Sequence, residues 1–125
     1  MGETYAPSLY LTVHNLWREG FLVLQAEGVL VAFVAAVPSG ERVARILMLG
    51  VLPERRQMGY GQRLMGELYS NSIAKGYDTM ILEVRKSNKE ALGFYERQGF
   101  TLTGEIDNFY SNGEGAYKMC KTLQS

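Results

Sequence analysis

Arg56-Gln57-Met58-Gly59-Tyr60-Gly61 is the stretch that decides the fold, because it joins two strongly patterned segments. Residues 44–52 before it are almost continuously apolar, which predicts a strand covered on both faces at the centre of a sheet. After it, apolar residues at helical spacing predict a helix that ends at Gly76. The sequence therefore predicts a strand, a glycine-containing turn and a helix in direct succession.

The remaining segments complete a mixed arrangement of helices and strands in one domain, residues 1–125. Further strands are expected at residues 21–25, 30–37, 79–85, 100–106 and 116–123. The first two form a hairpin, and the third closes a βαβ crossover, so it should run parallel to the central strand. A short amphipathic helix is expected from Pro7 to Gly20, and another helix from Ser87 to Gly99, where Ser87 and Glu90 have the spacing of a capping box.

The glycine turn has the properties of an anion site. A helix that follows such a turn directs free backbone N–H groups and the positive end of its dipole at one point. Gly59 and Gly61 allow close approach of a ligand. The Walker A motif is excluded because Gly61 is followed by Gln62-Arg63, and the dinucleotide fingerprint is excluded because Leu64 stands where its third glycine is required.

Composition excludes several classes of function. The chain has 13 Lys and Arg against 13 Asp and Glu, so no overall field attracts it to nucleic acid or to an anionic membrane. No apolar run approaches the ~18 residues of a membrane span. Cys120 is the only cysteine and His14 the only histidine, so we expect no metal site and no internal disulfide, and we expect a cytoplasmic location.

Two motifs in order resemble the GNAT acetyltransferases. The stretch Arg56-x-x-Gly59-x-Gly61 is similar to that family's pyrophosphate-binding motif. Leu82-Glu83-Val84-Arg85-Lys86-Ser87-Asn88 and its continuation to Phe100 resemble the second signature, in the form found in ribosomal-protein-alanine and other N-terminal α-amine acetyltransferases. Asn108-Phe109-Tyr110 and Asn112-Gly113-Glu114-Gly115-Ala116 resemble the aromatic pair and acidic turn of that subgroup.

The resemblance implies an α/β (α+β) GNAT fold, with a mixed central sheet, flanking helices and a parallel pair of strands that splays apart. The family opens with a strand and a helix ahead of the segment seen here, so the expected fold lacks its first strand. A homodimer, in which a second chain supplies that strand, is left open.

The resemblance also implies acetyl-CoA as co-substrate, with no metal. Backbone amides of the turn would bind the pyrophosphate, the central strand would pair with the pantetheine arm, and Asn88 would face that arm. The cofactor-binding residues expected in this way are Val51, Arg56, Gln57, Met58, Gly59, Tyr60, Gly61, Gln62 and Asn88.

By the same resemblance, Glu83 matches the general base and Tyr95 the general acid of a direct transfer to a primary amine. Phe109 and Tyr110 would bind the acceptor, a protein or peptide N-terminus. The subgroup has tyrosine at the positions of Arg55 and Phe109, which leaves acceptor recognition open.

Simpler explanations exist for each of these residues. Glu83 could be a strand carboxylate paired with Arg85, Tyr95 a core residue, Asn88 an N-cap, and Phe109 and Tyr110 ordinary strand aromatics. At the level of function, a small-molecule amine or lysine acetyltransferase and a non-catalytic coenzyme A-binding module are the alternatives. Retention of both Glu83 and Tyr95 argues against the last of these.

Overall fold

The computed structural model describes residues 17–124. The helix expected from Pro7 to Gly20 therefore lies mostly outside the described residues, and its end is the 3₁₀ turn η1 (Arg18–Gly20). The strands are β1 (Phe21–Ala26), β2 (Val29–Pro38), β3 (Val43–Val51), β4 (Thr79–Arg85), β5 (Thr101–Ile106) and β6 (Ala116–Thr122). The helices are α2 (Tyr60–Lys75) and α3 (Lys89–Arg97), and the 3₁₀ turn η2 (Pro53–Arg55) precedes the glycine turn.

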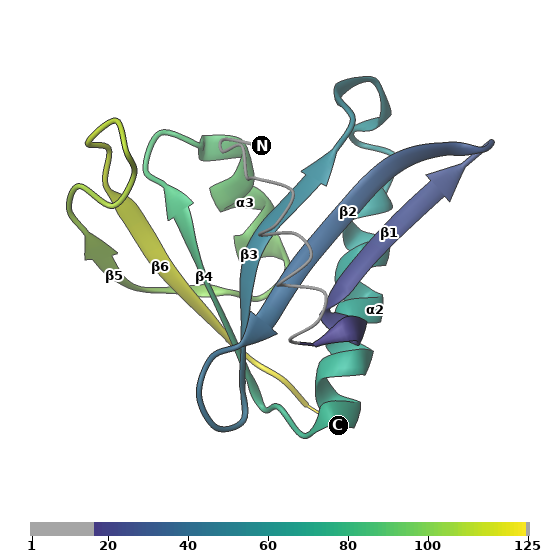
Figure 1. The fold of residues 1–125 in the computed structure, drawn as a ribbon. Coiled ribbons are helices and arrows are strands. Elements are labelled where there is room, and N and C mark those ends of the chain that lie inside the picture. Colours follow the sequence, from purple (N-terminus) through teal and green to yellow (C-terminus); the bar gives the residue numbers. More distant parts are fainter. Residues whose placement is uncertain (1–16, 125) are drawn as a thin grey trace.

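These strands form one mixed sheet in the order β1-β2-β3-β4-β6-β5 (Figure 1). The β3–β4 pair is parallel, as the predicted βαβ crossover requires, and the other neighbouring pairs are antiparallel. β3 lies in the interior of the sheet, as expected from its apolar run. The last strand, β6, inserts between β4 and β5, an order that the sequence did not reveal.

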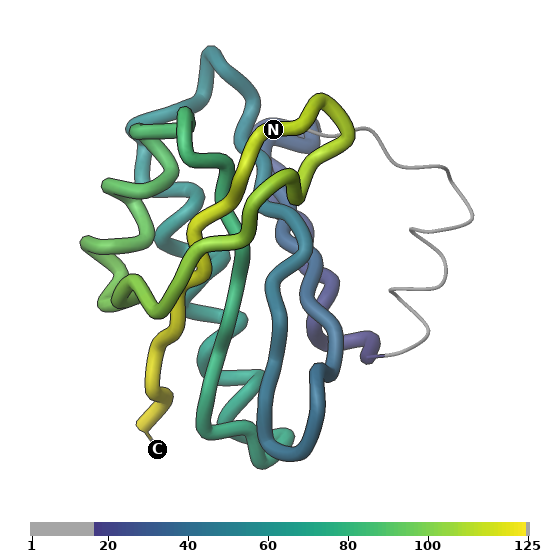
Figure 2. Tube along the Cα trace, turned by 90° about the vertical axis from the view of Figure 1, so that its left-hand side faces the viewer, coloured from purple at the N-terminus to yellow at the C-terminus, as the bar shows by residue number. Residues whose placement is uncertain are grey.

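Both α-helices pack on one face of the sheet (Figures 1 and 2). Leu64, Met65 and Leu68 of α2 belong to one buried hydrophobic cluster with alternate residues of the strands, such as Met80 and Leu82 of β4. The period of two along β4 sends Ile81, Glu83 and Arg85 to the opposite face. The helices therefore cover the apolar face, and the charged side chains of β4 lie on the other.

The parallel pair separates after four positions. β3 and β4 are in register from Val43 opposite Thr79 to Ile46 opposite Leu82, and β3 then continues to Val51 paired only with β2. The separation begins at a bulge: Ala35 and Ala36 of β2 pair with Met48 and Ile46, which leaves Leu47 as an extra residue. Figure 1 shows the two strands close at one end and far apart at the other, with α3 behind the opening. The predicted splayed pair is confirmed.

The start of α3 differs from the expected capping box. Asn88, not Ser87, is the N-cap, and its Oδ1 accepts a hydrogen bond from the Ala91 N–H at 3.0 Å. The Ser87 N–H instead donates to the Glu114 carboxylate at 2.8 Å. The predicted capping box is wrong, because the Ser87 N–H donates to this distant carboxylate and not to the Glu90 side chain. The helix therefore begins one residue later.

The close packing of η1 predicts a sensitive position. A Cβ added at Gly20 would lie 2.4 Å from Trp17 Cε3 and 2.7 Å from the Ala36 carbonyl oxygen. We expect Gly20→Ala to lower the free energy of unfolding by about 1–3 kcal/mol through overpacking, measured by chemical denaturation. Gly66→Ala is the matched control: Gly66 is exposed on α2 with open space around it, so the change should stabilise the helix by about 0.5–1 kcal/mol.

The Asn88 cap predicts a second stability effect. Asn88→Ala removes the acceptor for the Ala91 N–H and should lower the free energy of unfolding by about 1 kcal/mol. Asn88→Asp keeps an acceptor oxygen at the same place and should restore most of the loss. Equal stability of all three proteins in denaturant titrations would show that the cap contributes nothing.

Candidate functional site

A cavity of about 490 Å³ lies where the end of β3, the glycine turn and α3 meet. Most of the residues expected at a cofactor or catalytic site line it. These are Val51, Arg56, Gln57, Gly59, Tyr60, Gly61, Gln62, Asn88 and Tyr95. Two motifs that are far apart in the sequence therefore form one cavity.

Backbone groups dominate the wall formed by the glycine turn. Gln57 and Gly59 have φ angles of 64° and 80°, so the chain turns sharply through two left-handed residues before α2 begins. Gly59 is the N-cap of α2, and it has no side chain that could cap the helix. The N–H groups in the first turn of α2 are therefore available to a ligand, together with the positive end of the helix dipole. A Cβ at Gly61 would lie only 3.3 Å from the Phe94 ring, so glycine there lets α2 and α3 approach closely.

The part of β3 that no longer pairs with β4 forms a second wall of the cavity. Leu49, Gly50 and Val51 line the cavity beyond the point where β3 leaves β4. A strand in this position carries backbone N–H and C=O groups that no β4 residue pairs with. An extended ligand arm can therefore bind along it as a further strand would.

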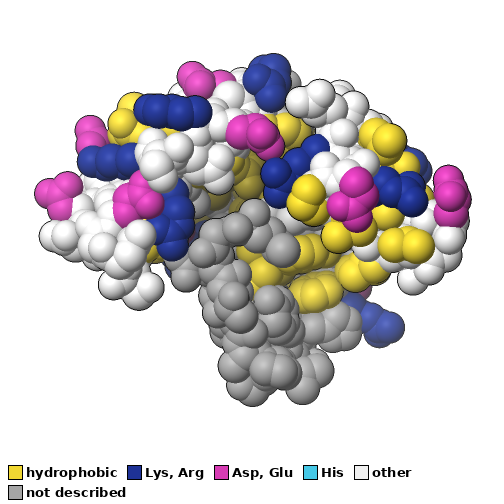
Figure 3. Space-filling model, turned by 90° about the horizontal axis from the view of Figure 1, so that it is seen from above, with side chains coloured by type: hydrophobic (Ala, Val, Ile, Leu, Met, Phe, Trp, Pro, Cys, Tyr) yellow, Lys and Arg dark blue, Asp and Glu magenta, His cyan; other side chains and the backbone are white. Residues whose placement is uncertain are grey.

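The cavity is locally basic although the chain has no net charge. Arg55, Arg56 and Arg97 line it, against the single carboxylate of Glu90. Arg56 donates from Nε to the Val51 carbonyl at 3.3 Å, and its Nη1 lies 4.0 Å from Glu90. On the face of the molecule that is seen from above, acidic and basic side chains are interspersed (Figure 3). An anion is thus favoured at this cavity and not over the whole surface.

Tyr95 is both a core residue and part of the cavity wall. It is 8% exposed, and its ring makes edge-to-face contacts with Phe94 and Phe100 at centroid distances of 5.4 and 5.5 Å. Burial, with a smaller contribution from the nearby Tyr110, raises the pKa of the Tyr95 hydroxyl. The group therefore keeps its proton at neutral pH.

Glu83 lies on the opposite face of β4 and does not line the cavity. Its Oε1 accepts hydrogen bonds from Arg45 Nε at 2.9 Å and Nη2 at 2.7 Å, and the Glu83 side chain is only 12% exposed. The alternative prediction that Glu83 pairs with Arg85 is wrong, since Arg85 pairs with Glu114. Arg45 was missed, although it is the one charged residue inside an otherwise apolar strand.

Three other expected residues also lie outside the cavity. Met58 is exposed at the tip of the glycine turn, so only the backbone around it contributes to that wall. Phe109 and Tyr110 lie in the loop between β5 and β6, not in a strand, with their rings 5.0 Å apart. The Arg85 guanidinium, at the end of β4, lies over the Tyr110 ring, so this loop packs against that end of the sheet.

Residues 17–124 contain no group of three or more His, Cys, Asp or Glu side chains arranged to hold a metal ion. None of the described helices has both the length and the apolar character needed to cross a membrane.

Known proteins support the family suggested by the two motifs. The model of the Acetyltransferase (GNAT) family matches residues 2–100. The N-alpha-acetyltransferase of Saccharolobus solfataricus is 32% identical over 92 residues, which are 72% of this chain and 54% of that protein. Mycothiol acetyltransferase of Streptomyces griseus is 34% identical over 93 residues, 74% of this chain but only 30% of that protein.

The chain thus spans about half or less of the length of these two relatives. Among solved structures, Ard1 from Thermoplasma volcanium is 34% identical and matches with a TM-score of 0.96, over 100% of this chain and 84% of that one. The fold and the sequence similarity agree, and the chain belongs to the Acetyltransferase (GNAT) family.

Proposed function

We propose that the chain transfers the acetyl group of acetyl-CoA to a primary amine, namely the α-amine of a protein or peptide N-terminus. The observation that carries this proposal is the cavity between an uncapped helix N-terminus and the free edge of β3. That cavity offers an anion site and an unpaired strand edge side by side. Similarity to an N-alpha-acetyltransferase supports the choice of acceptor.

The donor would be held mainly by backbone. Amides at the start of α2, from Tyr60 to Gln62, would bind the pyrophosphate, with Arg56 adding positive charge. The backbone of β3 near Val51 would pair with the pantetheine arm, and Asn88 can face that arm while its Oδ1 caps α3. When bound, acetyl-CoA supplies an activated thioester carbonyl.

The chemistry is a direct transfer in a ternary complex. The amine attacks the carbonyl carbon, a C–N bond forms and the C–S bond breaks. Glu83 accepts the proton lost by the amine, through water, and Tyr95 donates a proton to the departing thiolate. An α-amino group has a pKa near ~8, against ~10.4 for lysine, so a weak base such as a carboxylate is sufficient.

A small-molecule amine is the second candidate for the acceptor. Similarity to mycothiol acetyltransferase over 74% of the chain favours it. The departures from the peptide-specific pattern at Arg55 and Phe109 are compatible with it.

Binding and acceptor class are tested together. We expect calorimetric titration with acetyl-CoA to show saturable binding, and thiol release to be fastest with peptides that begin with Ala, Ser or Met. Faster release with polyamines would favour the small-molecule acceptor. Binding without release would indicate a coenzyme-binding module, and no detectable binding would contradict both enzyme proposals.

The proposed role of Tyr95 predicts a loss of turnover without a loss of acetyl-CoA binding. Tyr95→Phe should lower kcat by about 100-fold or more while acetyl-CoA binding is retained, because the ring remains and only the proton donor is lost. Since the pKa of Tyr95 is raised above its ordinary value near ~10, its ionisation should not limit activity below about pH 10. Tyr69→Phe is the matched control, because the Tyr69 hydroxyl binds Gln98 at 2.8 Å, away from the cavity.

The ion pair of Glu83 with Arg45 allows its two roles to be separated. Glu83→Gln should lower kcat/KM by about 100-fold if the carboxylate is the base. Arg45→Gln breaks the same pair but keeps that carboxylate, so it should retain most of the turnover. Equal losses in both variants, following their unfolding temperatures, would mean that Glu83 is only a structural partner of Arg45.

A further inference from the structure

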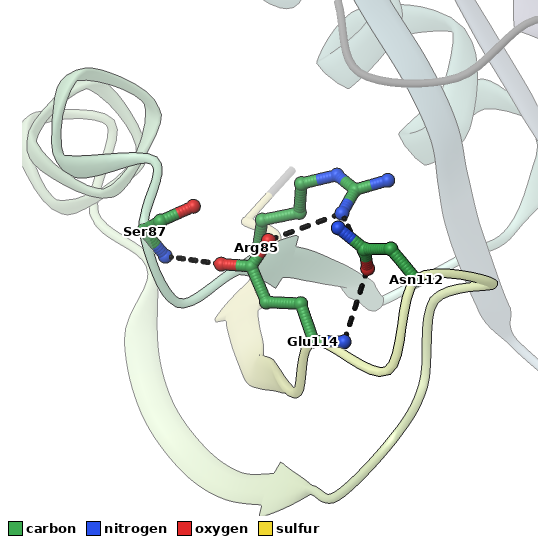
Figure 4. Close-up of polar contacts among 4 residues, drawn as sticks. All are labelled: Arg85, Ser87, Asn112 and Glu114. Atoms are coloured by element: carbon green, nitrogen blue, oxygen red, sulfur yellow. Dashed lines mark hydrogen bonds and ion pairs between the residues drawn. The ribbon is translucent and has the colours of Figure 1, made fainter.

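A carboxylate outside the cavity joins three segments of the chain (Figure 4). Glu114, in the loop between β5 and β6, accepts from Arg85 Nη1 on Oε1 at 3.1 Å and from the Ser87 N–H on Oε2 at 2.8 Å. Arg85 ends β4, and Ser87 precedes the N-cap of α3. The side chains of Arg85 and Glu114 are only 18% and 23% exposed, so water screens this pair less than it screens an ordinary surface pair.

The turn that carries Glu114 is closed by further hydrogen bonds. Asn112 Oδ1 accepts from the Glu114 N–H at 3.0 Å and from Arg85 Nη1 at 3.3 Å. The Tyr110 N–H donates to the Glu114 carbonyl at 3.0 Å. The position of Tyr110 is therefore tied, through one short turn, to the end of β4.

Arg85 also contacts the Tyr110 side chain. Its guanidinium carbon lies 4.0 Å from the centroid of the Tyr110 ring, the geometry of a cation–π contact. The guanidinium thus touches both the Glu114 carboxylate and the Tyr110 ring. Tyr110 is one of the two aromatic side chains expected to bind the acceptor, so the contact with Arg85 links the Glu114 carboxylate to the acceptor.

We propose that Arg85 and Glu114 are positioning residues that hold Tyr110 at the end of β4 and so set the affinity of the site for its acceptor amine. This inference rests on the proposed function. Neither residue lines the cavity assigned to acetyl-CoA. Glu114 lies in the loop that carries Tyr110 and Arg85 contacts that loop, so we expect the main effect on the acceptor.

The pair is intact under the conditions of the reaction. Hydrogen bonds from Ser87, and then from Arg85, hold the pKa of the Glu114 carboxyl below its usual range. The ionised carboxylate is therefore present throughout the neutral range, and the contact is lost only as the pH falls through that lowered value.

Glu114→Gln is the test, because glutamine keeps the shape of the side chain and removes its charge. We expect the KM for the peptide acceptor to rise about tenfold, while the KM for acetyl-CoA and the unfolding temperature change little. Glu105→Gln is the matched control: Glu105 pairs with the neighbouring Lys86 and has no contact with Tyr110, so its loss should leave both KM values unchanged.

Amide hydrogen exchange measured by NMR gives a readout that needs no activity. In Glu114→Gln the Ser87 and Tyr110 amides should exchange at least several-fold faster than in the wild type, and in Glu105→Gln they should not. An unchanged acceptor KM in an active enzyme, equal rises in both KM values, or unchanged exchange of these amides would overturn the inference. A wild-type protein that acetylates no amine would instead refute the proposed function, and the exchange experiment would still decide whether Glu114 positions the loop.

Discussion

The separation of β3 from β4 is the constraint on which the rest of the structure depends. An interior strand that gives up its partner leaves backbone N–H and C=O groups unpaired, which is costly unless something else satisfies them. Here the extra residue at Leu47 bends β3 away, while β4 stays paired with β6 up to Arg85. Without that bulge β3 would continue alongside β4 and the cavity between them would close. The edge of β3 that β4 leaves unpaired is therefore a wall of the cavity.

Local patterns predicted the elements of this fold well. The apolar run before Pro53, the left-handed Gly76 after α2 and the alternation along β4 each specify one element, and the structure has those elements within a residue or two. The position of β6 was not predictable, because nothing in the periodicity of a strand states which distant strand it will pair with. The start of α3 was misplaced by one residue for a similar reason, since a carboxylate 27 residues away binds the Ser87 amide.

The same division holds for the site. The cavity wall was predictable because the glycine turn and the start of α3 are continuous stretches whose geometry follows from their own residues. The ion-pair partners of the charged residues could not be predicted from the sequence. Arg45 reaches Glu83, and Arg85 reaches Glu114, only because of the register between strands that are separated in the sequence. Glycine and capping signals are local, whereas the choice of a charged partner is a property of the assembled sheet.

The wall that faces the proposed donor consists largely of main-chain amides, whereas the proposed acceptor side depends on the Tyr110 side chain and on Arg85, which contacts it. Main-chain amides are the same in every residue except proline, so substitutions at Gln57, Met58 or Gln62 would alter the surface without removing a hydrogen-bond donor. One exchanged side chain in the β5–β6 loop, by contrast, changes the shape and charge presented to the incoming amine. A scaffold divided in this way can exchange one substrate for another over evolutionary time while its source of acyl groups stays the same.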